Sequence, residues 1–261
     1  MGIINVTPDS FSGDGLNGDV KSIVDRALRM QEDGADILDI GAESTRPGHE
    51  TITFEEELSR LMPALESLVG QVRLPISIDT SKAGVAQRAI EAGAVIINDI
   101  SGLKSDSKLA GVAANSGAGL ILMHNQRGTN YQNLLPNITE SLRNSVNTAI
   151  ISGVHRDNII IDPGIGFGKT PDHNLEVLAR LNELKTLNCP ILVGSSRKST
   201  LGLLLDLPAD QRIEGTAATV TLAISGGADI VRVHDVKEMV RVCRVTDAVV
   251  RGWRPQGWNK F

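Results

Sequence analysis

The sequence predicts an α/β fold, a single (β/α)8 TIM barrel. Eight short apolar runs alternate with helix-like segments along the 261 residues, and one barrel takes about 250 residues. The same alternation fits an open doubly wound sheet. No linker or break in composition divides the chain, however, and this favours one closed barrel. We therefore expect residues 1–261 to form a single domain.

The predicted strands are short apolar runs, the pattern of buried parallel strands. A glycine that can end the preceding helix stands before four of them, at Gly34, Gly93, Gly117 and Gly227. The eight runs are residues 2–6, 37–40, 76–79, 95–98, 120–123, 159–162, 191–193 and 230–233. Their spacing leaves room for a helix after each strand.

Helix-like segments fill the intervals. Thr53 and Glu56 form a capping box before a leucine-rich stretch in which Pro63 predicts a kink. Thr170 and Pro171 match an N-cap followed by proline at the first helical position. The predicted helices are residues 22–32, a segment after Thr53, 85–92 capped by Ser81, 109–114 capped at or near Ser107, a segment opened by Asn137 and Glu140, a segment striped by Leu175, Leu178, Leu181 and Leu184, 217–224, and a segment opened by Asp235 and Glu238.

Composition narrows the class of partner. The net charge is −5, so nothing indicates a nucleic-acid-binding surface. No apolar run has membrane-spanning length, and the start of the chain has no signal-peptide pattern. The two cysteines, Cys189 and Cys243, stand among apolar neighbours and are expected to be buried thiols. We expect a cytoplasmic protein that acts on small molecules, without nucleic-acid or membrane partners.

Polar side chains end nearly every predicted strand. In a barrel these ends meet at one rim, where the chemistry of such folds takes place. Helix capping explains a single Asp or Asn as well as ligand binding does, but it does not explain the whole set. The set is Asn5, Asp39, Asp79, Asn98, His124, Asp162, residues 194–196, Arg232 and His234.

The chemistry of this set suits a flat heterocycle and an anion. Asp79, Asn98 and Asp162 supply hydrogen-bond acceptors and one amide, and Lys198 adds a cation. Arg232 and His234 stand two residues apart, so both point to the same side of their strand.

Arg232 and His234 suit an anionic substrate group, because Arg presents a planar fork and His a second donor. The alternative is a structural ion pair of Arg232 with Asp229 or Asp235.

The glycine-rich stretch after Asp162 fails two phosphate-loop patterns. Pro163 stands where the Walker pattern needs glycine, and Lys169 stands where the dinucleotide fingerprint needs its third glycine. The stretch is therefore interpreted as a turn that presents the carboxylate of Asp162 at a strand end.

The five histidines show no paired zinc spacing. Magnesium remains compatible, because it needs only one or two protein oxygens when substrate phosphates supply the others. Two polar loops, residues 7–15 and 41–48, are long enough to cover the barrel mouth and would bring in Phe11 and Arg46.

Five motifs together resemble the dihydropteroate synthases of the folate pathway, and the match runs from end to end in the family's order. The motifs are residues 5–11 (Asn-Val-Thr-Pro-Asp-Ser-Phe), 43–48 (Glu-Ser-Thr-Arg-Pro-Gly), 162–169 (Asp-Pro-Gly-Ile-Gly-Phe-Gly-Lys), 196–198 (Ser-Arg-Lys) and 232–235 (Arg-Val-His-Asp). The chain starts at the first strand itself, whereas family members usually carry a leading segment that can cover the barrel floor.

The resemblance implies transfer of a dihydropterin-methyl group from its diphosphate to p-aminobenzoate, with Mg²⁺ as cofactor and no covalent enzyme intermediate. The positions implied for pterin diphosphate are Thr45, Asp79, Asn98, Asp162, Lys198, Arg232 and His234. Those implied for p-aminobenzoate are Phe11, Thr45, Arg46, Pro47 and Ser196. Asn5, Lys198, Arg232 and His234 are the implied catalytic residues, and Asn5 is the implied Mg²⁺ ligand.

Two other functions stay open. A pterin-binding barrel that passes a methyl group from methyltetrahydrofolate to a corrinoid protein shares the strand-six acid, but it would lack the Ser-Thr-Arg-Pro-Gly and Ser-Arg-Lys segments present here. A homologue that only binds pterin or a partner is the second alternative. Barrels of this type often pair through their outer helices, so we expect a homodimer.

Overall fold

The computed structural model describes residues 1–6, 20–43 and 51–258, and the structural statements below concern these residues. Six parallel strands form one sheet in chain order: β1 (Gly2–Asn5), β2 (Leu38–Gly41), β3 (Ile76–Asp79), β4 (Ile96–Asp99), β5 (Gly119–Met123) and β6 (Ile159–Asp162). β7 (Leu192–Val193) pairs with β8 (Ile230–Val231) in the same parallel sense.

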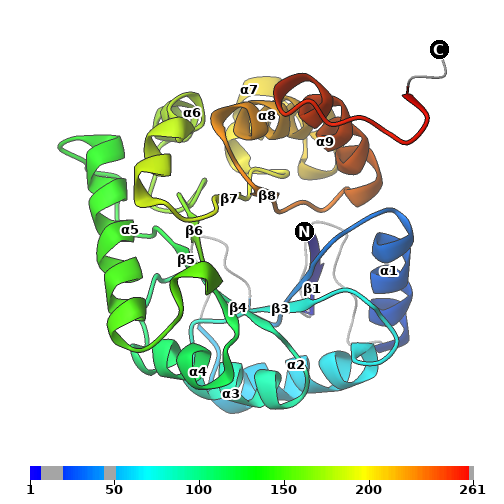
Figure 1. Ribbon diagram of the computed structural model, residues 1–261, viewed down its shortest axis with the longest axis vertical. Coiled ribbons are helices and arrows are strands. Elements are labelled where there is room, and N and C mark those ends of the chain that lie inside the picture. Colours follow the sequence, from blue (N-terminus) through cyan, green and yellow to red (C-terminus); the bar gives the residue numbers. More distant parts are fainter. Residues whose placement is uncertain (7–19, 44–50, 259–261) are drawn as a thin grey trace.

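Two single bridges join these sheets into a closed ring. Ile161 of β6 pairs with Ile191 just before β7, and Gly2 of β1 pairs with Val233 just after β8. The ring of strands therefore has no open edge between β8 and β1, and the predicted barrel is confirmed over an open sheet. Figure 1 shows the helices arranged around this ring.

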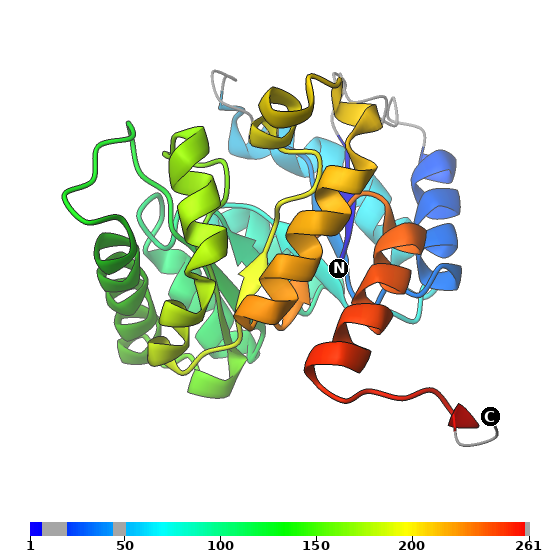
Figure 2. The same ribbon diagram turned by 90° about the horizontal axis from the view of Figure 1, so that it is seen from above.

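The helices cover the outside of the barrel. They are α1 (Val20–Glu32), α2 (Phe54–Leu68), α3 (Ala83–Glu91), α4 (Lys108–Ser116), α5 (Leu134–Ile151), α6 (Pro171–Ala179), α7 (Ser199–Leu205), α8 (Ile213–Gly226) and α9 (Val236–Val250), with short 3-10 turns η1 (Arg156–Asn158), η2 (Leu181–Leu187) and η3 (Ala209–Gln211). α8 and α9 lie side by side (Figure 2). None of the described helices combines the length and apolar character that crossing a membrane requires.

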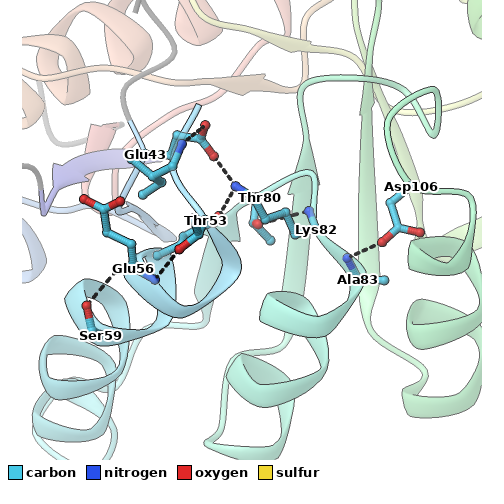
Figure 3. Close-up of polar contacts among 10 residues, drawn as sticks. Glu43, Thr53, Glu56, Ser59, Thr80, Lys82, Ala83 and Asp106 are labelled. Carbon is cyan, nitrogen blue, oxygen red and sulfur yellow. Dashed lines mark hydrogen bonds and ion pairs between the residues drawn. The ribbon is translucent and has the colours of Figure 1, made fainter. Parts of the chain in front are cut away.

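Two predicted N-caps are confirmed. The hydroxyl of Thr53 accepts from the amide of Glu56 at 3.2 Å and opens α2 (Figure 3). Thr170 opens α6 with Pro171 in the first turn, and the side chain of His173 completes a capping box there. The helix α2 continues through Pro63 as one element.

Other helix starts differ from the prediction. α3 begins after Lys82, not under a Ser81 cap, and the carboxylate of Asp106 accepts from the amide of Ala83 at 2.9 Å (Figure 3). α5 begins at Leu134, one turn before the predicted start, because the side chain of Asn137 instead accepts from the amide of Asn133 at 3.0 Å. In both cases a residue distant by three or more positions supplies the acceptor.

The predicted leucine stripe and the segment after Lys198 also differ from the prediction. α6 ends at Ala179, so the predicted leucine stripe is split between α6 and the 3-10 turn η2, and Leu175 is 38% exposed. The helix α7 was not predicted, because its run of leucines directly after Lys198 shows no helical periodicity.

Candidate active site at the barrel mouth

The barrel interior changes from apolar to polar along four of the strands. Ile37, Ile96, Ile160 and Ile230 pack together with Ile121 and Leu192 at the floor end of the barrel. Side chains two positions apart on a strand face the same way. The interior residues that come next toward the mouth are therefore Asp39, Asn98, Asp162 and Arg232. On these strands the interior positions are thus apolar at the floor and polar at the mouth.

Arg232 joins three strands at this mouth. Its Nε donates to Oδ2 of Asp39 at 2.5 Å, and its Nη2 donates to Oδ2 of Asp79 at 2.8 Å. The predicted alternative, an ion pair with Asp229 or Asp235, is wrong. The carboxylate of Asp229 instead accepts from the amide of Ile191.

Asp235 is likewise taken by another residue, since the guanidinium of Arg197 donates to both of its carboxylate oxygens. Asp229 and Asp235 thus each bond to another residue, and Arg232 reaches across the barrel to Asp39 and Asp79.

Asn98 belongs to the same network. Its Nδ2 donates to Oδ2 of Asp39 at 3.1 Å. Asp39 is fully buried, and its other oxygen, Oδ1, has no hydrogen-bond partner within the described part of the chain. Asp39 therefore accepts hydrogen bonds from two candidate ligand-binding residues, Asn98 and Arg232. The sequence indicated Asp39 only as one of the polar strand ends.

The charge state of this network depends on burial. Burial raises the pKa of Asp79 to about 7, while Arg232 acts in the opposite direction and the charge of Asp39 adds to the rise. The pKa of Arg232 is raised by Asp39 and Asp79 against the cost of burial. Arg232 is therefore a permanent cation beside a carboxyl group that exchanges its proton near neutral pH.

Asp162 and Lys198 complete the interior face. The amide of Gly164 donates to Oδ1 of Asp162 at 2.7 Å, and burial raises the pKa of Asp162. The Nζ of Lys198 lies 4.2 Å from the ring centre of Phe167. Burial lowers the pKa of Lys198 to about 8, with Arg232 acting in the same sense. These groups are poorly hydrated and ready to bind a polar ligand.

His234 lies beside Ser196. The hydroxyl oxygen of Ser196 accepts from the amide of His234 at 3.2 Å and lies 3.0 Å from its Nδ1. Burial, with Arg197 and Arg232 nearby, lowers the pKa of His234 well below its usual value. The imidazole is therefore neutral in the free protein, and a Ser196 hydroxyl that donates to Nδ1 leaves the hydrogen on Nε2.

The side chain of Lys169 holds the glycine-rich turn after Asp162 by hydrogen bonds to its backbone carbonyls. The Nζ of Lys169 is buried and donates to the carbonyls of Gly164 and Phe167 at 3.0 and 3.1 Å, and it lies 3.0 Å from Nδ1 of His124. Burial lowers the pKa of Lys169 to about 7 and that of His124 to about 3. Lys169 and His124 therefore hold the turn rather than face the mouth.

A second charged group surrounds Lys82. The ammonium of Lys82 lies 2.5 Å from Oε2 of Glu43 (Figure 3). It also lies 2.6 Å from Oε2 of Glu57. Glu43 also accepts from the amide of Ile52 at 3.3 Å. We call Glu43, Lys82 and Glu57 the stem cluster; Lys82, in the loop after β3, links Glu43, which follows β2, to Glu57 of α2.

The structure describes only some of the remaining predicted site residues. Phe11, Thr45, Arg46 and Pro47 lie outside the described residues. Asn5 ends β1 at the mouth and is partly exposed. No group of three or more His, Cys, Asp and Glu side chains suited to a metal ion occurs within residues 1–6, 20–43 and 51–258. At the opposite end, a cavity of about 580 Å³ is lined by Met1, Asp36, Asp247 and Trp253 among others.

Comparison with known proteins assigns the family. The model of the pterin-binding enzyme family matches residues 1–234. The dihydropteroate synthase of Clostridium beijerinckii is 50% identical over 252 residues, which are 96% of this chain and 94% of that one. The dihydropteroate synthase of Bacillus subtilis is 49% identical over 250 residues, 96% of this chain and 88% of that one.

Solved structures agree with this assignment. A dihydropteroate synthase from Clostridium difficile, determined in the presence of pteroic acid, is 47% identical and covers 96% of each chain with a TM-score of 0.92. One from Xanthomonas albilineans with 4-aminobenzoic acid is 40% identical, covers 98% of this chain and 93% of that one, and gives a TM-score of 0.91. The chain therefore belongs to the dihydropteroate synthase family of pterin-binding enzymes.

Proposed function

We propose that this chain catalyses the dihydropteroate synthase reaction. A (7,8-dihydropterin-6-yl)methyl group leaves its diphosphate and is joined to the amino nitrogen of p-aminobenzoate. The observation that carries this proposal is the convergence of Asp79, Asn98 and Asp162 with the cations Lys198 and Arg232 on one buried rim. This mixture of acceptors and cations suits a heterocycle with N–H donors that carries an anionic group.

The pterin ring takes the acceptors. Oδ1 of Asp162 is engaged by the amide of Gly164, so Oδ2 is the oxygen that can accept from the ring. Asn98 points its nitrogen at Asp39, so its carbonyl oxygen is the group that can accept from the ligand. Lys198 supplies a donor to a ring nitrogen or oxygen. In a site shielded from water, such hydrogen bonds gain strength.

The diphosphate takes the donors. Arg232 uses Nε and one hydrogen of Nη2 for the two aspartates, which leaves Nη1 and the second Nη2 hydrogen for phosphate oxygens. His234 can donate from Nε2, and its pKa rises when an anion binds beside it. Both groups stabilise the negative charge that develops on the leaving diphosphate, so catalysis is electrostatic and needs no protein nucleophile.

The reaction balances without another reagent. The bond between the methylene carbon and the diphosphate oxygen breaks, and its electron pair leaves with diphosphate. The resulting cation is conjugated with the pterin, and the arylamine nitrogen adds to it. The nitrogen then loses one proton. Exclusion of water protects the cation from hydrolysis.

A Mg²⁺ ion fits the chemistry at the end of β1. Asn5 offers one neutral carbonyl oxygen at the partly exposed mouth, which is sufficient where a diphosphate supplies the other ligands. Asn5 would hold the ion, and the ion would neutralise charge on the diphosphate.

The p-aminobenzoate position is proposed at Phe11, Thr45, Arg46, Pro47 and Ser196. Of these, Ser196 is within the described chain, at the mouth beside His234. Arg46 would meet the carboxylate of the arylamine, and Phe11 its ring. Thr45 would also contact the pterin diphosphate.

We also propose a cytoplasmic homodimer. Exposed apolar side chains on the outer helices support self-association: Leu203 and Leu204 of α7 are 71% and 60% exposed, and Val249 of α9 is 81% exposed. Sedimentation equilibrium measures the mass directly. A monomer at micromolar concentration would contradict the dimer.

The test of function is release of diphosphate from dihydropterin diphosphate, measured with and without p-aminobenzoate and with and without Mg²⁺. We expect release that depends on p-aminobenzoate and is strongest with Mg²⁺. Absence of p-aminobenzoate-dependent release contradicts the proposal. Methyl transfer from methyltetrahydrofolate to a corrinoid protein would assign the chain to the other pterin-binding class instead.

A further inference from the structure

Asp39 is a fully buried charged group at the mouth. Its exposure is 0%, and Oδ1 has no partner among the residues described. Both described side chains that donate to Asp39, Arg232 and Asn98, belong to the candidate site. A buried carboxylate with one unpartnered oxygen lowers the stability of the folded protein. We therefore look for the role of Asp39 in the candidate site and not in stabilising the fold.

We propose that Asp39 is a positioning residue that aims the guanidinium of Arg232 and fixes the amide orientation of Asn98. The proposal rests on the function proposed above, because it assigns to Asp39 the alignment of the diphosphate-binding and pterin-binding groups. Asp39 acts through these two side chains, and contact with substrate is not needed.

The first step concerns Arg232. Its side chain has several rotatable bonds, and a hydrogen bond at Nε fixes the plane of the guanidinium. Asp79 accepts from the terminal Nη2 at 2.8 Å, whereas Asp39 accepts from Nε, the nitrogen that joins the guanidinium to its side chain. The bond from Nε to Asp39 therefore sets the orientation of the guanidinium, and the remaining guanidinium hydrogens point in a fixed direction.

The second step concerns Asn98. An ionised carboxylate only accepts hydrogen bonds, so the group that faces Oδ2 of Asp39 at 3.1 Å must be the nitrogen of the Asn98 amide. The carbonyl oxygen is thereby directed elsewhere. Without Asp39, the amide of Asn98 could rotate by half a turn and present a donor where the ligand needs an acceptor.

A matched control is available on a neighbouring strand. Asp99 at the end of β4 is also 0% exposed, but its carboxylate accepts from the backbone amides of Ser101 and Leu103 at 2.8 and 2.6 Å. Asp99 thus has the same burial and formal charge, and within the described chain its carboxylate is bonded to backbone amides of its own loop, not to the candidate site. Asp99→Asn measures the general cost of removing a buried charge at the rim.

The experiment is a double-mutant cycle on ligand affinity. Calorimetry measures binding of dihydropterin diphosphate, and of hydroxymethyl-dihydropterin without phosphates, to the full chain and to Asp39→Asn, Arg232→Gln, the double variant and Asp99→Asn. We expect Asp39→Asn to weaken diphosphate-substrate binding by about 10-fold or more, and Asp99→Asn to leave it within about 2-fold.

The coupling between the two substitutions shows whether Asp39 acts through Arg232. If Asp39 acts through Arg232, the double variant binds the diphosphate substrate within about 2-fold of Arg232→Gln alone. Independent, multiplicative losses overturn the proposal, as does unchanged binding by Asp39→Asn. Failure of the unmodified chain to bind dihydropterin diphosphate is a different outcome, because it contradicts the proposed function itself.

A second variant covers the case in which Asp39→Asn does not fold. Asp39→Glu keeps the charge and moves the carboxylate by one methylene. We expect a folded protein with a lower affinity for the diphosphate substrate and a reduced kcat. A folded Asp39→Glu variant with unchanged affinity and kcat would overturn the positioning role.

Discussion

Two clusters in this molecule have the same charges and different surroundings. The mouth cluster places Arg232 between Asp39 and Asp79. The stem cluster places Lys82 between Glu43 and Glu57. Each therefore has two carboxylates around one cation. Each also contains one buried carboxylate oxygen without a partner in the described chain, Oδ1 of Asp39 and Oε1 of Glu57.

The difference lies in which elements contribute the charges. The mouth cluster comes from β2, β3 and β8, and its side chains face the barrel interior beside Asn98. The stem cluster comes from the end of β2, the loop after β3 and α2, and it joins those elements to one another. Charge composition alone therefore does not separate the proposed ligand-binding cluster from a structural one. Position relative to the barrel interior does.

The largest expected effect is at Arg232. Arg232→Gln removes the fork that we propose binds the diphosphate, and we expect kcat/KM to fall by about 10²- to 10³-fold. Binding of the diphosphate substrate should weaken much more than binding of a pterin without phosphates. Steady-state kinetics and calorimetry check both. Equal losses for the two ligands would place Arg232 away from the diphosphate.

The next effect is at Asp162, which we propose accepts a hydrogen bond from the pterin. Asp162→Asn replaces an acceptor by a group that also donates, and the lost charged hydrogen bond is worth about 1.5–3 kcal/mol. Calorimetry with hydroxymethyl-dihydropterin should show a loss of about 10- to 100-fold in affinity. Unchanged pterin affinity would mean that Asp162 does not contact the ring.

At the stem cluster the expected effect is on stability. Lys82→Met leaves the buried carboxylate of Glu57 without its cation, and we expect a loss of about 1–2 kcal/mol, since Lys82 is partly exposed. Urea unfolding measures this loss, while pterin affinity stays within about 2-fold of the unmodified chain. Arg180→Gln, in an exposed ion-pair group on the outer surface, is the control and should unfold like the unmodified chain. A large loss of pterin affinity in Lys82→Met would remove the distinction between the clusters.

The smallest expected effect is a change in titration. The pKa of Asp79 is raised to about 7, chiefly by burial. The native state therefore holds a proton that the unfolded chain releases near pH 4, and the contribution of Asp79 to stability falls as the pH rises from 4 to 7. Carboxyl ¹³C NMR should show Asp79 titrating near neutral pH.

The groups that act on Asp79 are Arg232, Asp39, Glu57 and Asp99. Because the charge of Asp39 raises the pKa of Asp79, Asp39→Asn should move the titration to lower pH. Movement to higher pH would contradict the charge arrangement of the mouth cluster.

Much of the barrel could be predicted from local patterns. The strand ending at Asp162 has the same bounds in sequence and structure, because Ile159–Asp162 is a β-branched run that ends in a turn rich in glycine. The cap of Thr170 was readable for a similar reason, since the hydroxyl and its amide partner are three residues apart. Period-two alternation places the next polar residues on the interior face.

The pairings within the site could not be predicted. Arg232 has Asp229 and Asp235 as sequence neighbours, but its partners are 193 and 153 positions away in the chain. Closure of the barrel decides this pairing, because it brings β8 beside β1 and faces Arg232 toward β2 and β3. The role of Asp39 was missed for the same reason. Its signal was present, since Ile37 and Asp39 stand two apart on one strand.

The most direct test is a crystal structure of the chain with dihydropterin diphosphate bound. The account predicts the pterin ring against Asp79, Asn98 and Asp162, with the diphosphate on Arg232 and His234 and the Nε of Arg232 still donating to Asp39. A ligand seated away from Asp162, or in the floor cavity beside Met1 and Trp253, would contradict it.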